Sequence, residues 1–187
     1  MSRMMFLLPL VVTIFLSACD APPHPADLPP QTAQQLAELT TGILALGPNV
    51  DVTEAKRAAK MAFEYPRQLA IEYRVTDPPL VHNAKVNAGL RTRGLCWHWA
   101  QDLERRLTQE NFKTLDLHRA IANSRKSFRI EHSTVIISQK GDTLYQGLVL
   151  DPWRNGGLLY WGSPQADTRY DWLPAQLVLD ERAAEQG

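Results

Sequence analysis

Five prolines fall within the twelve residues from Asp20 to Gln31, and this cluster constrains the fold of the chain more than any other feature. Proline lacks the backbone N–H that helix interiors and central strands need, so the segment predicts a stiff, extended tether. The tether separates a short leader, residues 1–19, from residues 32–187, which at roughly 155 residues have the length of one domain. This domain must therefore supply its own core and any functional site.

The leader has the pattern of an export signal. Arg3 is followed by the apolar run Met4–Leu16, which is too short to span a bilayer and fits a signal-peptide core. The run leads into Leu-Ser-Ala-Cys, which resembles the lipobox of bacterial lipoproteins. This resemblance implies that Cys19 is lipidated and anchors the mature chain, since each buried CH₂ gains about 0.8 kcal/mol. Asp20 resembles an inner-membrane retention signal, so we expect a periplasm-facing protein of the bacterial cell envelope.

Net charge and cysteine content limit which partners the domain can have and which roles Cys96 can have. Removal of the leader takes only Arg3 from the 20 basic and 20 acidic residues, which leaves a formal charge of −1. This balance lacks the basic excess of a nucleic-acid-binding protein, so no nucleic-acid partner is expected. If Cys19 carries lipid, Cys96 has no partner in the chain. Such a thiol is either buried and inert, which composition alone favours, or retained for its reactivity.

Hydrophobic spacing predicts several helices before Cys96. One covers Gln35–Leu46, and a second covers Lys56–Tyr65, with Thr53 as its cap and a break or kink at Pro66. A short helix is expected around Asn83–Ala88. These helices are predicted to cover the core of an α+β domain.

The sequence GLCWHWAQDLERRL, residues 94–107, predicts a helix that begins near Cys96. Cys96, Leu103 and Leu107 lie on one stripe with Trp99 or Ala100, so this stripe is expected to face the core. His98 lies about 200° around the helix from Cys96 and is expected on the polar side with Asp102, Arg105 and Gln109. A metal site of the Cys-x-His type is therefore disfavoured, and we expect no metal and no cofactor.

Two strands are predicted after this helix, His132–Ser138 and Thr143–Asp151. A two-residue Gly141-Asp142 turn between them would give Gly141 a positive φ and place His132 directly opposite Asp151. A turn shifted by one residue keeps both side chains on one face, whereas a three-residue loop would separate the faces. The prediction is thus an antiparallel sheet against which the Cys96 helix packs.

These residue types favour nucleophilic chemistry. Free N–H groups and the dipole at a helix N-terminus stabilise a thiolate, and a neighbouring imidazolium adds to this effect. A carboxylate such as Asp151 orients the imidazole of His132 and stabilises its charged form. The N–H of Cys96 could donate to an oxyanion, and Gly94 permits a close backbone approach.

The order and spacing of Gly94-Leu95-Cys96, His132 and Asp151-Pro152 resemble the core of the transglutaminase-like superfamily of papain-like cysteine enzymes, over residues 80–161. The resemblance implies that Cys96 is the nucleophile, His132 the general base and acid, and Asp151 the residue that orients His132. It also implies a thioester intermediate formed from an amide or ester. The residues after His132 and after Pro152 depart from the family pattern, so no substrate is carried over. A related group of peptidoglycan peptidases usually has a second histidine, which is absent downstream here.

Other roles stay open at this point. Asn83 is a candidate oxyanion donor, with helix capping as the alternative. The aromatic residues Trp97, Trp153, Tyr160 and Trp161 could line a groove or belong to the core. The expected partners are the membrane, through Cys19, and a peptide or protein amide of the envelope, stem peptides of peptidoglycan included. Two alternatives to an enzyme are an inactive papain-like binding module and a structural lipoprotein with Cys96 in its core.

Overall fold

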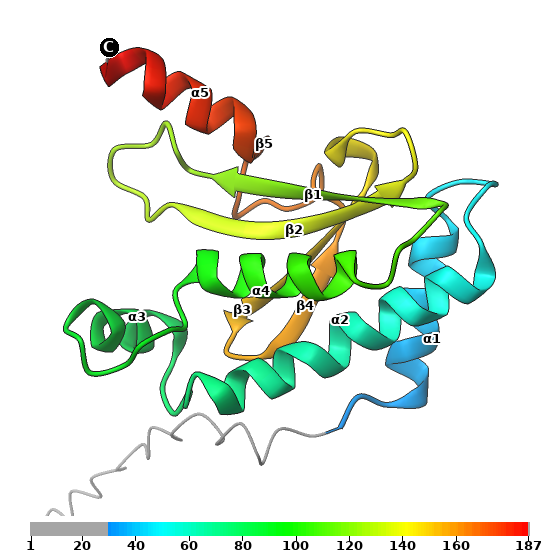
Figure 1. Cartoon of the computed structure of the whole chain (residues 1–187), viewed down its shortest axis with the longest axis horizontal. Coiled ribbons are helices and arrows are strands. Elements are labelled where there is room, and N and C mark those ends of the chain that lie inside the picture. The colour runs from blue at the N-terminus through cyan, green and yellow to red at the C-terminus, as the bar shows by residue number, and fades with distance from the viewer. Residues whose placement is uncertain (1–29, 187) are drawn as a thin grey trace, which may run out of the picture.

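An antiparallel sheet covered by helices makes up residues 30–186, which are the residues that the computed structural model describes (Figure 1). The predicted lipid site at Cys19 and residues 20–29 lie outside this part of the chain. The helices are α1 (Ala33–Leu44), α2 (Val52–Glu72), α3 (Pro79–Asn87), α4 (Cys96–Thr108) and α5 (Ala175–Gln186). The strands are β1 (Leu115–Ala122), β2 (His132–Gln139), β3 (Leu148–Asn155), β4 (Leu158–Gly162) and β5 (Trp172–Pro174). The α+β prediction is confirmed.

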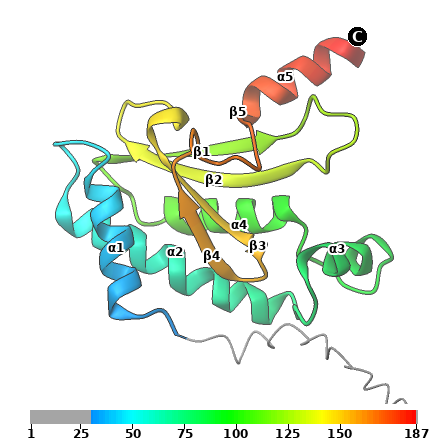
Figure 2. The same cartoon turned by 180° about the vertical axis from the view of Figure 1, so that it is seen from behind.

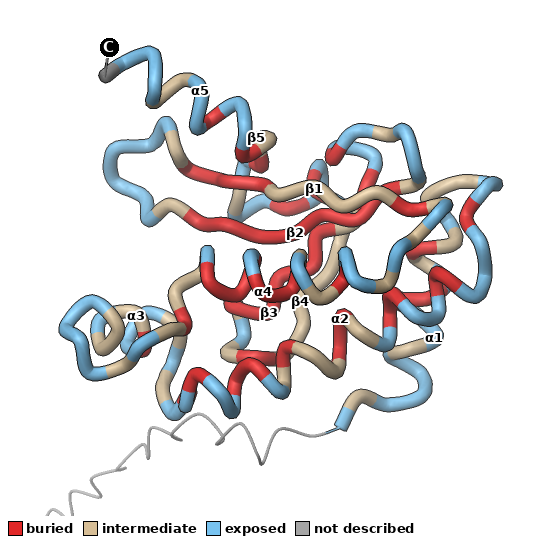
Figure 3. Tube along the Cα trace, in the orientation of Figure 1, coloured by how far each residue is buried: buried red, intermediate tan, exposed pale blue. Residues whose placement is uncertain are grey.

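The sheet has the strand order β4-β3-β2-β1-β5, and all neighbouring strands are antiparallel. The central strand β2 is buried along nearly its whole length, because both faces of the sheet are covered (Figure 3). Val135 and Ile137 pack into a core formed with α1, α2 and α4. Ile136 points to the other face, where it packs with Ala120 and Trp172. This alternation fixes which side chains of β2 can share a site.

The helices form a layer in which α4 lies between the sheet and α2 (Figure 1). Small side chains on α2 allow this close packing, namely Ala55, Ala58, Ala59 and Ala62, all fully buried. Asp51, not Thr53, caps the helix by accepting a hydrogen bond from the Glu54 N–H at 2.9 Å. Of the predicted break or kink at Pro66, the break is wrong. The helix continues through it, because packing of this long helix on the core offsets the missing N–H donor.

The connection between β2 and β3 differs from the predicted two-residue hairpin. Gly141 has the expected positive φ, +90°, but the predicted strand 143–147 is replaced by a 3₁₀ turn, η2 (Leu144–Gln146). Its Leu144 side chain is buried beside Ile136, and Ile136 pairs with Val149 instead of the predicted Gly147. His132 is therefore not directly opposite Asp151. A shift of two residues preserves the face, so the two side chains still lie on the same side of the sheet.

Three elements meet at one end of the sheet. The N-terminus of α4, the first residue of β2 and the short helix α3 lie together there, as both views show (Figures 1 and 2). Helix α3 is exposed or half-buried except for His82, and α5 projects beyond β1 and β5 (Figure 3). The end of the sheet beside α3 and the start of α4 carries the candidate site.

Candidate active site

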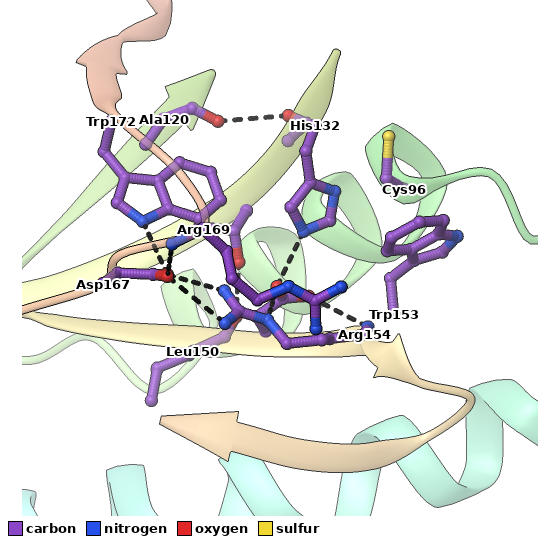
Figure 4. A network of polar contacts seen from close by, with 12 residues as sticks. Cys96, Ala120, His132, Leu150, Trp153, Arg154, Asp167, Arg169 and Trp172 are labelled. Carbon is purple, nitrogen blue, oxygen red and sulfur yellow. Dashed lines mark hydrogen bonds and ion pairs between the residues drawn. The ribbon is translucent and has the colours of Figure 1, made fainter. Parts of the chain in front are cut away.

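The three predicted catalytic residues are brought together at this end of the sheet: Figure 4 shows Cys96 beside His132, and His132 bonds Asp151. Asp151 accepts a hydrogen bond from Nε2 of His132 at 2.7 Å, and both side chains are almost completely buried. Cys96 is the first residue of α4 and half-buried, and its thiol donates to the carbonyl of Glu131 at 3.7 Å. Among the described residues, Nδ1 of His132 has no hydrogen-bond partner. Figure 4 shows this nitrogen on the side of the ring that faces Cys96.

The charge state of His132 follows from its neighbours. Burial alone lowers the pKa of His132, because a charged ring loses its hydration. The Asp151 carboxylate, its hydrogen bond and the nearby Cys96 outweigh burial and raise the pKa to about 9. His132 is therefore an imidazolium at neutral pH, and an imidazolium next to a thiol favours the thiolate.

Arg154 continues this chain of buried charges. Its Nε donates to Asp151 Oδ2 at 3.0 Å, and its terminal NH2 group donates to Asp167 Oδ2 at 2.7 Å. The guanidinium stacks on the ring of Tyr160 at 3.7 Å. Burial raises the pKa of Asp167, but the bonds from Arg154, the Arg169 N–H and Trp172 outweigh it and lower the pKa below its ordinary value. Positive and negative groups thus alternate from His132 to Asp167, which neutralises a cluster that would otherwise be costly to bury.

Aromatic rings enclose His132. The rings of Trp153, Tyr170 and Trp172 lie with centroids 4.7, 4.5 and 5.4 Å from its imidazole. Sequence reasoning identified neither Arg154 and Asp167 nor Tyr170 and Trp172 as parts of the site. The one available signal was an arginine three residues after the candidate Asp151.

Three rings fix the backbone just before Cys96. His82 Nε2 bonds the Arg93 carbonyl at 2.9 Å, and Trp99 Nε1 donates to the Gly94 carbonyl at 2.9 Å. Nδ1 of His98 accepts from the N–H groups of Gly94 and Leu95 at 3.2 and 3.1 Å. Gly94 has φ +124°, and a Cβ there would lie 2.2 Å from His82 Nε2. Gly94 therefore permits a close approach, as predicted, and the group that approaches its backbone is the His82 ring.

The predicted exposure of His98 and Asp102 is wrong, since both are buried. The helical pattern assumed one covered face, but α4 is covered by the sheet on one side and by the end of α2 on another. There Asp102 accepts from the hydroxyl of Tyr73, at the end of α2, and from Arg93 at 2.8 Å. Burial first, and then the charge of Arg93, lower the pKa of His98, so its ring is neutral and Nδ1 can accept. Arg105 and Gln109 are exposed, as predicted.

Asn83 lies on α3 and contacts the aromatic wall of the site. Its Oδ1 accepts a hydrogen bond from the indole N–H of Trp153 at 3.1 Å, and the ring of Trp153 in turn lies beside His132. This bond assigns the acceptor end of the Asn83 amide and leaves its NH₂ group as the end that could donate elsewhere. Of the other predicted groove aromatics, Trp97 is 47% exposed, whereas Trp161 packs against the main core.

A cleft of about 600 Å³ opens onto His132 and Trp153. Its walls come from the start of α3, from the β1–β2 loop and from the segment before β5. Beside His132 and Trp153, the lining residues are Pro78, Pro79, Leu80, Asn123, Arg129, Ile130, Arg154, Thr168, Arg169 and Tyr170. His132 is thus one of the lining residues of this cleft, whereas Cys96 is not.

Comparisons with protein-family models, with curated proteins and with solved structures gave no match for this chain. Within residues 30–186, no helix combines the length and the apolarity needed to cross a membrane. In the same part of the chain, no group of three or more His, Cys, Asp and Glu side chains is arranged to hold a metal ion.

Proposed function

We propose that the protein is a thiol enzyme that hydrolyses an amide or ester, or transfers its acyl group, through Cys96. One observation carries the proposal. Cys96 at a helix N-terminus faces the free nitrogen of a histidine whose other nitrogen bonds a buried carboxylate, Asp151. The transglutaminase-like, papain-like core is part of this proposal, and it is supported by the chain order of the three residues and by a Cys-bearing helix packed on an antiparallel sheet.

The acylation step follows from this arrangement. The reactive form pairs a Cys96 thiolate with the His132 imidazolium, in which the proton lies on Nδ1 instead of on Sγ. The thiolate attacks the substrate carbonyl, and the developing oxyanion accepts from the N–H of Cys96, which as the first helical residue has no partner within the helix. The NH₂ group of Asn83 is the candidate second donor. The imidazolium then returns the proton to the leaving amine or alcohol as the C–N or C–O bond breaks.

Deacylation runs the same proton path in reverse. Neutral His132 takes a proton from water or from an amine, which attacks the thioester, and returns it to the Cys96 sulfur as the C–S bond breaks. Asp151 keeps Nε2 protonated throughout, which leaves Nδ1 as the nitrogen that exchanges the proton. Arg154 donates to the same Asp151 oxygen as His132 and so helps to hold the carboxylate in place.

The proposed setting is the cell envelope. The lipobox at Cys19 would anchor the domain to the membrane through the tether, residues 20–31, and Asp20 favours the periplasmic face of the inner membrane. Peptides, protein amides and peptidoglycan stem peptides are the substrate classes within reach of such an anchor. Fractionation of cells that express Cys19→Ala tests the anchor, because the variant should leave the membrane fraction.

Alkylation of Cys96 by iodoacetamide tests the site without a known substrate. In the domain spanning residues 20–187, we expect wild-type Cys96 to react at pH 7 about tenfold faster than in His132→Ala, because the imidazolium stabilises the thiolate. The difference should shrink as pH rises through about 9, where His132 loses its proton. The measurement is the second-order rate constant of alkylation as a function of pH.

His118→Ala is the matched control, since His118 is a partly buried strand histidine that bonds Ser138 and lies away from Cys96. It should leave the alkylation rate unchanged. A burst of p-nitrophenol from p-nitrophenyl acetate, with one acetyl group recovered on Cys96, would show the acyl-enzyme. Slow alkylation of Cys96 at a rate that His132→Ala does not change would contradict the proposal. The remaining interpretations would be a binding or a structural lipoprotein.

A further inference from the structure

The charges around the cleft are strongly unequal. Three arginines line it, Arg129, Arg154 and Arg169, and no aspartate or glutamate is among its lining residues. Arg154 is neutralised by Asp151 and Asp167. Within the described residues, the guanidinium groups of Arg129 and Arg169 have no carboxylate partner, and the acidic residues Glu131 and Asp171 pair with Arg182 and Lys126.

We propose that Arg129 and Arg169 form a subsite for a carboxylate of the acyl substrate, so that the enzyme acts on acidic peptides or acidic side-chain amides. This inference rests on the proposed function and adds the substrate class to it. A guanidinium presents a planar fork of N–H donors that matches a carboxylate, and two guanidinium groups that have no carboxylate partner beside one cleft attract such a group before it binds.

Both arginines are held on backbone that the site itself fixes. Asp167 accepts from the backbone N–H of Arg169 at 3.1 Å, and the same carboxylate bonds Arg154. Arg129 donates to the carbonyl of Arg169 at 3.3 Å. Asn123 closes the β1–β2 loop that carries Arg129, because its Nδ2 donates to the carbonyl of Ile130 at 3.1 Å. The subsite is therefore tied to the same network that orients His132.

The subsite also lies close to the reacting groups. The Arg169 guanidinium is 5.9 Å from the ring of Tyr170, and that ring is 4.5 Å from the imidazole of His132. Figure 4 shows the Arg169 side chain extending toward Trp153. A substrate with its carbonyl at Cys96 could thus reach Arg169 with a carboxylate a few bonds away, as in a glutamate or aspartate residue.

Two alkylating probes of equal size test the subsite. N-iodoacetyl-glutamic acid α-amide carries a free side-chain carboxylate, and N-iodoacetyl-glutaminamide replaces it with a neutral amide. Relative to a free cysteine peptide, wild-type Cys96 should prefer the acidic probe by about three- to tenfold, the scale of one or two exposed ion pairs. Added NaCl should reduce this preference, because salt screens exposed charges. The double variant Arg129→Gln/Arg169→Gln should reduce it to about one.

Arg125→Gln is the control, since Arg125 belongs to the same loop but pairs with Glu181 and does not line the cleft. It should retain the preference. Arg169→Glu should reverse it in favour of N-iodoacetyl-lysinamide, and an unchanged melting temperature would show that the variants fold. Equal rates for the acidic and neutral probes in the wild type would overturn the subsite, even if His132→Ala slows both. If His132→Ala left the alkylation rates of both probes unchanged, the proposed function would be overturned instead.

Discussion

Cys96 and His132 are held in place by two different kinds of chemistry. On the helix side, neutral rings bond backbone groups of Arg93, Gly94 and Leu95, and the thiol is positioned indirectly through the chain. On the sheet side, the imidazole is held directly by Asp151, at one end of a row of buried charges. The position of Cys96, the proposed nucleophile, depends on loop geometry, whereas that of His132, the proposed acid–base group, depends on charge balance.

Two histidines show what the difference means. His98 and His132 are both buried, and burial lowers the pKa of each. For His98 the nearby cation Arg93 lowers the pKa further and outweighs the opposing charge of Asp102, so that Nδ1 remains an acceptor. His132 contacts the anion Asp151, which raises its pKa to about 9. The neighbouring charges thus leave the His98 ring neutral, so that it accepts from backbone N–H groups, and keep the His132 ring charged, as its proposed role requires.

Removal of the carboxylate on the sheet side should have the largest effect. Asp151→Asn leaves the size of the side chain but removes the charge that holds His132 and Arg154, so the acylation rate should fall about 10³-fold or more. The measurement is the burst rate with p-nitrophenyl acetate. Asp171→Asn is the control, because Asp171 pairs with the exposed Lys126, and it should keep the rate. An Asp151→Asn burst within about twofold of wild type would contradict the role of the buried charges.

The same substitution should change how stability depends on pH. His132 has a folded pKa above its ordinary 6.5, so its pairing with Asp151 stabilises the fold fully below pH 6.5. That contribution is lost as pH rises through about 9, and the shift sets an upper limit of about 3 kcal/mol on it. Urea unfolding should therefore show a large difference between wild type and Asp151→Asn at pH 6 that narrows above pH 9.

A glycine substitution should disturb the loop before Cys96, on the helix side of the site, and its effect should be smaller than that of Asp151→Asn. Gly94→Ala puts a methyl group 2.2 Å from His82 Nε2, whereas Gly89→Ala, at φ +73°, meets no atom within 4 Å. Gly89→Ala should cost about 1 kcal/mol of stability from backbone strain alone. Gly94→Ala should cost about 2 kcal/mol more and also slow Cys96 alkylation, because the loop must move. Equal losses of melting temperature in the two variants would show that the His82 contact is unimportant.

The sequence predicted the α+β class and the residues that meet at the candidate site, because these depend on local patterns. The helix that begins at Cys96, the strand that begins at His132 and the face shared with Asp151 all follow from spacing of period 3.6 or 2. The face was predicted correctly although the register was not, since an error of two residues leaves a strand's alternation unchanged.

The remaining parts of the site depend on contacts between distant segments. Arg154 and Asp167 are partners only because the segment before β5 returns to β3. The 3₁₀ turn at Leu144 forms because Leu144 finds a place in the core, which the residues Thr143–Gly147 do not reveal by themselves. His98 has the spacing of an exposed residue, and only the fold of the preceding loop turns it into a buried acceptor. The periodicity of one segment does not show which residues from distant segments will contact it in the folded protein.

The smallest predicted effect concerns His98. Its dependence on pH distinguishes the helix side of the site, which holds Cys96, from the sheet side, which holds His132. The folded pKa of His98 lies below the ordinary 6.5, so the bonds from the Gly94 and Leu95 N–H groups are intact above pH 6.5 and are lost as the ring takes up a proton in acid. His98→Asn offers Oδ1 as an acceptor that does not titrate. We expect this variant to alkylate Cys96 within about threefold of wild type at pH 7, and to retain more of its reactivity than wild type when the pH is lowered to 5. His98→Ala removes the acceptor at every pH and should be slower throughout. If Asn and Ala variants showed the same pH profile, the ring would be filling space, and the loop before Cys96 would owe its shape to His82 and Trp99 alone.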